Sequence, residues 1–326
     1  MNKKYDRRQH IKPLIFGVEG TVASAKELEL FNIHNPLGFI IFSRNIETPE
    51  QLRKLIMQLK ATVFPRNDVL ILVDQEGGRV QRLKSPYWND IPDAKSFGDM
   101  IQTETLNRVK KSVYNHFRLC AHELKRMGIN VNCAPMVDLY YENTDAIIGD
   151  RAFSSDHFEV TELAKEVCRG LLMGNVFPVV KHVPGHGRAK ADSHKELPVI
   201  EAGLHRLRNT DFMPFAELKH MPFMMTAHVK YSAIDQENCA TQSRKVVDII
   251  SKEIGFKNML LTDDLTMGAL KGSMKQRAEK SLEAGCDILL HCSGNYDEMK
   301  ELAENTDNFS PEDRERFREC WKSLRF

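Results

Sequence analysis

The sequence predicts a single α/β domain, a closed (β/α)8 barrel of the TIM type, and two observations support this fold class. Eight short apolar runs recur along the 326 residues, and each ends in polar or glycine residues. Amphipathic helical patterns lie between them, and no stretch rich in proline or serine divides the chain. Continuous apolar runs are typical of strands covered on both faces, and their alternation with helices is typical of parallel sheets. We therefore expect one barrel domain over residues 1–326.

The expected strands are short apolar segments that lead into polar residues. They lie within residues 13–20, 37–45, 68–78, 129–139, 177–187, 223–231, 259–265 and 286–294. A doubly wound open sheet is the alternative fold, and it commonly carries a glycine-rich phosphate loop after its first strand. The corresponding turn here reads GVEGTVAS and lacks the third glycine of that motif, so the barrel is favoured.

Helices are expected between the strands, over residues 48–63, 105–128, 157–175, 243–255 and 274–285. In the first of them, Thr48 is placed as the N-cap, and Leu52 and Ile56 follow at helical spacing. The others run into glycine or asparagine, residues that commonly end helices.

A further helix is expected at the end of the chain. The residues SPED at 310–313 provide an N-cap, a proline in the first turn and two acidic side chains, which together predict a helix start. We expect a closing helix over about 310–326 that packs on the outside of the barrel, and no second domain.

Composition restricts the partners and the compartment. The chain has 46 Lys and Arg against 45 Asp and Glu, a net charge of +1, which is too small to recruit nucleic acid or an anionic membrane. The seven cysteines include no C-x-x-C pair, and their odd number favours buried thiols in a reducing compartment over a disulfide framework. No run approaches the roughly 18 apolar residues of a membrane span, and no signal core follows the basic N-terminus. We therefore expect a cytoplasmic protein with no nucleic-acid and no membrane partner.

Polar side chains at the C-terminal ends of the expected strands are candidates for function, because active sites of such barrels lie at that end. They are Arg44, Asp74, Glu76, Asp138, Lys181, His182, His228, Asp263, Asp264 and His291. Carboxylates accept hydrogen bonds from hydroxyl groups, and one of them can attack an anomeric carbon as a nucleophile. Rows of carboxylates that face lysine, arginine and histidine indicate a polar, uncharged substrate such as a sugar.

The segment KHVPGHGRAKADSH, residues 181–194, gathers His182, His186, His194 and Asp192 on one loop, with Lys181 alongside. The H-x₃-H spacing of His182 and His186 keeps a metal-dependent barrel hydrolase as one alternative. Pro184 and Gly185 lie between the two histidines, so the segment is not helical and the spacing does not place both imidazoles on one face. We expect no metal and no cofactor.

Five stretches share a pattern with a known family. They are GFIIFSRN, VDQEGGRVQRL, IGDRAFSSD, KHVPGHGRAKADSH and LLTDDLTMGAL, which occur in this order from about Leu37 to the region of the eighth strand. The chain resembles family 3 glycoside hydrolases, specifically the bacterial cytoplasmic β-N-acetylglucosaminidases (beta-hexosaminidases) of peptidoglycan recycling. The KHVPGHG element with DSH behind it is highly specific to this branch. Val183 departs from the family pattern, which commonly has an aromatic residue there.

The resemblance implies a retaining hydrolase that forms a covalent glycosyl-aspartate intermediate. It implies that Asp263 is the nucleophile, that His194 is the general acid/base and that Asp192 is the carboxylate paired with it. The residues implied to hold sugar hydroxyls are Asp74, Arg82, Arg151, Lys181 and His182. The implied substrate is a small carbohydrate, an N-acetylglucosamine linked to an anhydro-N-acetylmuramic acid that carries a peptide. The single-domain branch is expected to be monomeric.

The chemistry of glycoside cleavage is compatible with these roles. A glycosidic oxygen leaves poorly as an alkoxide, so it needs a proton donor, and the anomeric carbon needs a nucleophile on the opposite face. The pKa of a free imidazole, about 6.5, already lies in the working range, and Asp192 would orient the ring of His194. Gly185 and Gly187 are expected to let the loop close over the substrate.

Two other activities stay open at this point. A phosphorylase could use the same site, because a histidine acid/base carries no negative charge to repel phosphate. A non-catalytic sugar-binding barrel would have no need for the Asp-Ser-His element. Among the remaining polar residues, a structural role is favoured for Arg44, Glu76, Asp138, His186 and Asp264, and His228 is equally compatible with the core or the site.

Overall fold

The protein forms a closed barrel of eight parallel strands. The computed structural model describes residues 10–322 except 66–67, 143 and 145. The barrel strands are β1 (Lys12–Gly17), β2 (Pro36–Ile41), β3 (Leu70–Val73), β6 (Val131–Asn132), β7 (Phe177–Val183), β9 (Phe223–Thr226), β11 (Met259–Asp264) and β12 (Ile288–His291). Each pairs with its neighbour in chain order, and β12 closes the ring by pairing with β1. Every expected segment overlaps one of these strands, so the predicted barrel is confirmed.

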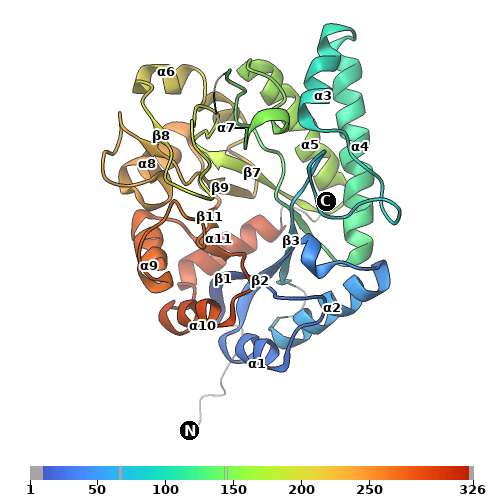
Figure 1. Ribbon diagram of the computed structural model, residues 1–326, viewed down its shortest axis with the longest axis vertical. Helices are drawn as coiled ribbons and strands as arrows, with labels where there is room; N and C mark the ends of the chain where they lie inside the picture. The colour runs from blue at the N-terminus through green and yellow to red at the C-terminus, as the bar shows by residue number, and fades with distance from the viewer. Residues whose placement is uncertain (1–9, 66–67, 143, 145, 323–326) are drawn as a thin grey trace.

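Helices surround the strands (Figure 1). They are α1 (Ala25–His34), α2 (Pro49–Thr62), α3 (Ala94–Asp99), α4 (Leu106–Met127), α5 (His157–Met173), α6 (Leu204–Asn209), α7 (Met213–Glu217), α8 (Arg244–Ile249), α9 (Met274–Ala284), α10 (Tyr296–Asn305) and α11 (Pro311–Lys322). The Thr48 hydroxyl caps α2 by accepting from the Gln51 amide, and Gly128 ends α4 with a φ of 92°. Within the described residues, no helix is long and apolar enough to cross a membrane.

Two short pairs of strands lie outside the barrel and carry loops of its rim. They are β4 (Gln75–Gly77) with β5 (Val80–Gln81), and β8 (Val199–Ile200) with β10 (Lys230–Tyr231). The first pair immediately follows β3. The second joins the segment after β7 to the segment after β9.

Alternate residues of each strand face the interior of the barrel. Leu70 and Leu72 of β3 pack in the interior cluster, whereas Ile71 and Val73 pack against the helices. The same alternation places Val179 of β7 and Leu261 of β11 in the interior. Since side chains of a strand point to opposite faces in turn, this pleat also decides which polar residues at the strand ends reach the mouth of the barrel.

The final helix covers the N-terminal end of the barrel. Phe317 and Cys320 of α11 are buried in the interior cluster. The Trp321 ring lies 5.3 Å from the ring of Phe177, which in turn contacts Phe223 at 5.4 Å between ring centroids. The expectation that this helix packs on the outside of the barrel is therefore wrong. The helix starts at Pro311 as expected, and residues 323–326 of the expected range lie outside the described part of the chain.

Candidate active site

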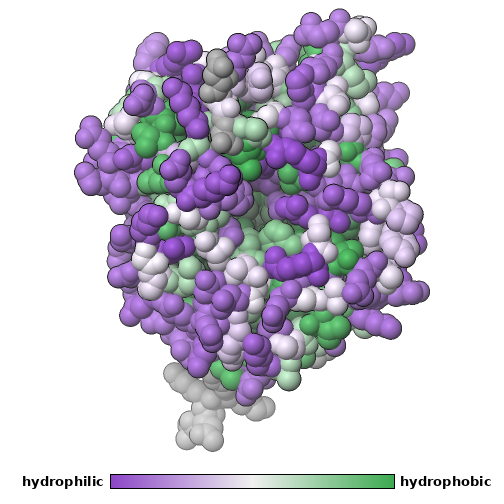
Figure 2. Space-filling view, viewed as in Figure 1, coloured by the Kyte–Doolittle hydropathy of each residue, from purple (hydrophilic) through white to green (hydrophobic). Residues whose placement is uncertain are grey.

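The pleat of three strands brings three polar side chains into the mouth of the barrel. Asp74, Lys181 and Asp263 each lie two residues beyond an inward-facing apolar residue, namely Leu72, Val179 and Leu261. All three line a cavity of about 240 Å³ at the C-terminal ends of the strands. The space-filling view shows this face hollowed near its middle (Figure 2). The structure therefore brings these three strand-end residues together at one cavity.

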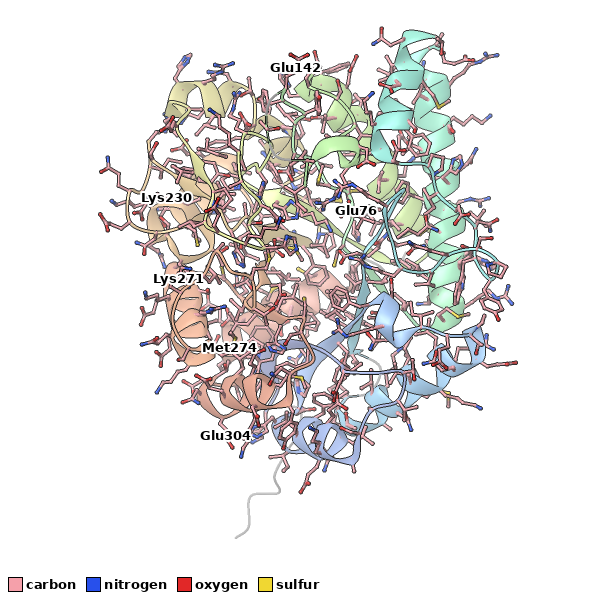
Figure 3. All side chains as sticks on the ribbon, in the orientation of Figure 1. Glu76, Glu142, Lys230, Lys271, Met274 and Glu304 are labelled. Carbon is pink, nitrogen blue, oxygen red and sulfur yellow. The ribbon has the colours of Figure 1, made fainter. Side chains whose placement is uncertain are left out.

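A buried network of charges forms one wall of the cavity. The Lys181 ammonium lies 2.9 Å from Asp74 Oδ1 and 2.6 Å from Glu76 Oε1. The Arg151 guanidinium donates two hydrogen bonds of 2.8 Å to the Glu76 carboxylate, and Arg82 donates to Asp74 at 3.2 Å. Glu76 lines the cavity and is labelled near the middle of the stick view (Figure 3). Four of the five residues expected to hold sugar hydroxyls thus meet in one network, with Glu76 as its additional carboxylate.

The network keeps its members ionised. Burial would raise the pKa of Asp74, but Lys181 and Arg82 outweigh it and hold the pKa below its usual value. Burial is likewise outweighed at Glu76 by Arg151 and Lys181, so its pKa is also lowered. Burial would lower the pKa of Lys181, but the two carboxylates raise it overall. These fixed charges can accept from or donate to hydroxyl groups of a bound ligand without changing protonation state.

His182 is the fifth residue expected to bind the sugar, and a buried carboxylate orients its ring. Asp138 Oδ2 lies 2.7 Å from His182 Nδ1, and its other oxygen accepts from the His186 backbone amide at 2.5 Å. The hydrogen bond to Asp138 keeps the proton of the His182 ring on Nδ1. The other ring nitrogen, Nε2, is then available to a ligand in the cavity that His182 lines. The rim-acceptor role favoured for Asp138 agrees with these contacts.

His186 connects the strand end to the loop that follows it. Its side chain is buried, and Nε2 lies 3.2 Å from the hydroxyl of Ser193. Burial, together with the nearby His182, lowers the pKa of His186 to about 4. The imidazole is therefore neutral at physiological pH, which fits the structural role favoured for it.

The Asp-Ser-His segment presents one imidazole to solvent and to the cavity. The side chain of His194 is 61% exposed, and its Nδ1 lies 2.8 Å from Asp192 Oδ1. The same carboxylate oxygen accepts from the His194 backbone amide at 2.9 Å. Burial would raise the pKa of Asp192, but the hydrogen bonds from His194 lower it overall. The pairing of Asp192 with His194 expected from the sequence is therefore present, and Asp192 is ionised.

The two glycines of the loop lie close to buried neighbours. A Cβ on Gly187 would lie 2.0 Å from the Leu139 carbonyl oxygen. Gly185 has a φ of 132°, and its carbonyl accepts a 2.6 Å hydrogen bond from the buried Tyr231 hydroxyl. These contacts describe the conformation in the structure, and the expectation that these glycines let the loop close stays a prediction.

The adjacent acids of β11 have different environments. Both line the cavity, and Asp263 Oδ1 accepts from the Asp264 amide at 2.8 Å. Burial would raise the pKa of Asp263, but His182 and His228 outweigh it, so the carboxylate is ionised. The carboxylate of Asp264 instead accepts from Thr266 and from the Cys292 amide, at 2.6–3.0 Å. Asp264 therefore holds the turn after β11, in agreement with the structural role favoured for it.

Two further strand-end candidates, His228 and Arg44, make hydrogen bonds that hold neighbouring segments of the barrel together. His228 is buried between the Thr241 hydroxyl at 2.7 Å and the Asp264 carbonyl at 2.9 Å, which places it in the core rather than on the cavity wall. Arg44 donates to the carbonyls of Val18 and Cys292. Among the described residues, no group of three or more His, Cys, Asp or Glu side chains is arranged to hold a metal ion.

Sequence reasoning missed or underrated several residues of the cavity. Glu76 follows Asp74 by two positions, so strand alternation could have placed both on the same side. Arg79, which donates to Asp150 at 2.6 Å and to carbonyls of residues 146–148, fixes the loop that carries Arg151. No local pattern predicts this contact, because its two halves are about seventy residues apart in the sequence.

The fold and the site together define a class of protein. A parallel barrel carries, at the C-terminal ends of its strands, an ionised carboxylate, a carboxylate-paired imidazole and fixed charges that suit hydroxyl groups. This combination of groups is typical of barrel enzymes that act on carbohydrates.

The comparison with known proteins identifies the family. The chain matches the glycosyl hydrolase family 3 N terminal domain over residues 17–319 and therefore belongs to this family. It is accordingly a glycoside hydrolase, as the sequence resemblance implied. It is 34% identical over 299 residues to the beta-hexosaminidase of Methylobacillus flagellatus, covering 90% of this chain and 83% of that one. It is 36% identical over 289 residues to that of Alkalilimnicola ehrlichii, covering 86% and 80%.

Solved structures are similar over almost the whole chain. NagZ from Neisseria gonorrhoeae, in complex with N-trifluoroacetyl-D-glucosamine, matches with a TM-score of 0.87 and 32% identity, covering 97% of this chain and 91% of that one. A family 3 β-N-acetylglucosaminidase from Paenibacillus sp. matches with a TM-score of 0.83 and 27% identity, covering 100% of this chain and 62% of that one.

Proposed function

We propose that the protein is a retaining β-N-acetylglucosaminidase that removes a terminal N-acetylglucosamine through a covalent glycosyl-aspartate intermediate. The observation that carries the proposal is the shared cavity of Asp263 and His194, an ionised, partly buried carboxylate and an exposed imidazole held by Asp192. Retaining hydrolysis needs these two functions, a nucleophile and a proton donor. The family membership and the beta-hexosaminidase relatives support the same activity.

In this mechanism Asp263 attacks the anomeric carbon while His194 protonates the departing oxygen. The glycosidic bond breaks as the bond to the Asp263 carboxylate forms, and the proton moves from the imidazole to the leaving group. His194, now neutral, then takes a proton from water as the water displaces Asp263. Asp192 stabilises the imidazolium in the first step and keeps the ring oriented in the second.

The charged side chains of the cavity wall, together with His182, bind the sugar in this proposal. Asp74 and His182 offer acceptors to hydroxyl protons, whereas Lys181, Arg82 and Arg151 offer donors to hydroxyl oxygens. Because four of these groups bind one another in the network and His182 is held by Asp138, they are in place before the substrate arrives, which reduces the entropy lost on binding.

The natural substrate that we propose is a peptidoglycan fragment, an N-acetylglucosamine linked to an anhydro-muramic acid with its peptide. We also propose that the protein acts in the cytoplasm as a monomer. Support for a reducing compartment comes from the seven cysteines, since six of them are buried. Support for the sugar comes from the Neisseria relative, which binds an N-acylated glucosamine.

Trapping of the intermediate tests the mechanism. An activated 5-fluoro-N-acetylglucosaminide should label a single peptide that contains Asp263, and an aryl β-N-acetylglucosaminide should be hydrolysed far faster than the matching β-glucoside. Asp263→Ala should lose nearly all turnover, whereas Asp264→Asn should keep much more of it. Labelling at Asp74, or a product of inverted configuration, would contradict the proposal. Formation of a sugar phosphate when phosphate is added would instead identify a phosphorylase.

A further inference from the structure

The backbone of the Asp-Ser-His segment rests on the turn that follows the strand of Asp263. The Gly268 amide donates a 3.1 Å hydrogen bond to the His194 carbonyl, and the Ala269 amide donates at 3.2 Å to the Ser193 carbonyl. These two bonds join segments about seventy-five residues apart. They hold the two halves of the reaction centre together through backbone atoms only.

Gly268 leaves no room for a side chain at this contact. A Cβ at this position would lie 2.7 Å from the carbonyl oxygen of Lys195 and 2.8 Å from that of His194. The φ of Gly268 lies outside the left-handed region, so other residues can adopt this backbone conformation. Glycine is therefore required here for the close approach of two backbones and not for an unusual dihedral angle.

The turn that receives the loop is itself firmly held. The carboxylate of Asp264 accepts from the amide and the hydroxyl of Thr266, and the Met267 amide donates to the Asp264 carbonyl at 3.1 Å. Arg277 of α9 donates to the Leu265 carbonyl at 2.7 Å. The turn therefore moves with β11, and a group hydrogen-bonded to it keeps its place relative to Asp263.

A second attachment lies on the other side of the same segment. The hydroxyl of Ser193 lies 3.2 Å from Nε2 of the buried His186, and Ser193 is itself only 3% exposed. The backbone at residues 193–195 is thus held from two directions, although the imidazole of His194 remains largely exposed. The two attachments restrict the loop and leave the proton-donating ring accessible.

We infer that Gly268 is a positioning residue, which sets the distance between the proton-donating loop and the nucleophile by admitting the backbone of His194 to the turn after β11. The inference rests on the proposed function of His194 and Asp263, and it concerns how the distance between these two residues is fixed. A side chain at position 268 would push the loop away and leave the sugar-binding wall and Asp263 in place.

Gly268→Ala tests the inference, with Gly203→Ala as the matched control because no atom lies within 4 Å of a Cβ at position 203. General acid catalysis contributes about 10²–10⁴-fold, so a displaced loop should cost kcat/KM roughly 10-fold or more on a substrate with a poor leaving group. On a dinitrophenyl glycoside, whose leaving group needs no proton, the loss in kcat/KM should be under about 3-fold. The control should match the wild type on both substrates.

Equal losses of Gly268→Ala on both substrates would overturn the inference, because they would indicate general damage to the site. If Gly268→Ala does not fold, Ser193→Ala provides the test, since it removes the second attachment without adding bulk. It should show a smaller loss with the same dependence on the leaving group, and a loss that is independent of the leaving group would count against the inference.

Amide hydrogen exchange separates this inference from the proposed function. Gly268→Ala should speed exchange in peptides that cover residues 189–197, whereas exchange in β11 and in the control variant should stay unchanged. This result is expected even if the protein proves inactive on N-acetylglucosaminides, in which case only the proposed function fails. Unchanged exchange in residues 189–197 would overturn the inference whatever the activity.

Discussion

Replacement of Glu76 by glutamine is a direct test of the buried charge network. The wild-type network has three cations, Arg82, Arg151 and Lys181, against the two carboxylates of Asp74 and Glu76. Glu76→Gln keeps the shape of the side chain but leaves three cations with one carboxylate. The side chains of Arg151 and Lys181 are only 10% and 4% exposed, so water cannot replace the lost partner.

Loss of one partner from a buried ion pair typically costs about 3–5 kcal/mol in the free energy of unfolding. Glu76 serves two cations, so we expect at least the lower value. At about 2 °C per kcal/mol for a chain of this size class, the midpoint of thermal unfolding should fall by about 6 °C or more.

The exposed pair of Arg208 and Glu253 provides the control. It has a similar two-bond geometry, with distances of 2.6 and 2.7 Å, but its side chains are 47% and 38% exposed. Such surface pairs contribute about 0–1 kcal/mol, so Glu253→Gln should change the midpoint little. If Glu76→Gln lowers the midpoint no more than Glu253→Gln, the network does not stabilise the fold and the reasoning fails.

The pH dependence has a definite sign. The folded-state pKa of Glu76 is lowered, so the stability that Glu76 contributes is fully present above the unfolded pKa of about 4.3. It is lost as the pH falls towards the folded pKa. The difference in stability between the wild type and Glu76→Gln should therefore be constant above about pH 5 and shrink below pH 4. A difference that grows on acidification would contradict the lowered pKa.

Three further predictions concern catalysis. His194→Ala should lose roughly 10²–10⁴-fold in kcat/KM with a natural disaccharide but far less with a nitrophenyl leaving group, whereas equal losses would assign it to binding. The lowered pKa of Asp263 keeps it ionised in acid, so the kcat/KM profile should show no loss attributable to its protonation until below about pH 3.9. Prolonged dialysis against a strong chelator should leave activity intact, and loss with rescue by zinc would support a metal-dependent hydrolase instead.

The fold could be predicted because its determinants are local. Each barrel strand is a short apolar run, and the caps of α2 and α4 lie at Thr48 and Gly128 as the sequence indicates. Several helices were not predicted, although Ser24 and Glu27 form a capping box at the start of α1. The position of α11 could not be read from its pattern, because an apolar helix face does not reveal whether it meets helices or the end of a barrel.

The sequence predicts those site residues that lie at strand ends or within a family motif, because both features are read from neighbouring residues. Asp74, Lys181 and Asp263 follow from strand ends and pleat. The partners of these residues do not, since Asp138 meets His182 and Gly268 meets His194 only in the folded chain. The close packing at Gly187 could not be predicted for the same reason, because its neighbour Leu139 is distant in the sequence.

The position of α11 has a consequence for how the protein is made. The first barrel strand pairs with the last, and the aromatic floor beneath Phe177 and Phe223 is supplied by residues near the C-terminus. A nascent chain on the ribosome therefore holds an open sheet whose inner face is exposed to water until α11 emerges. Because domains generally fold as units, we expect this barrel to complete its fold only after α11 has left the ribosome. Premature termination even within α11 would yield a protein that lacks its floor, rather than a shorter working enzyme.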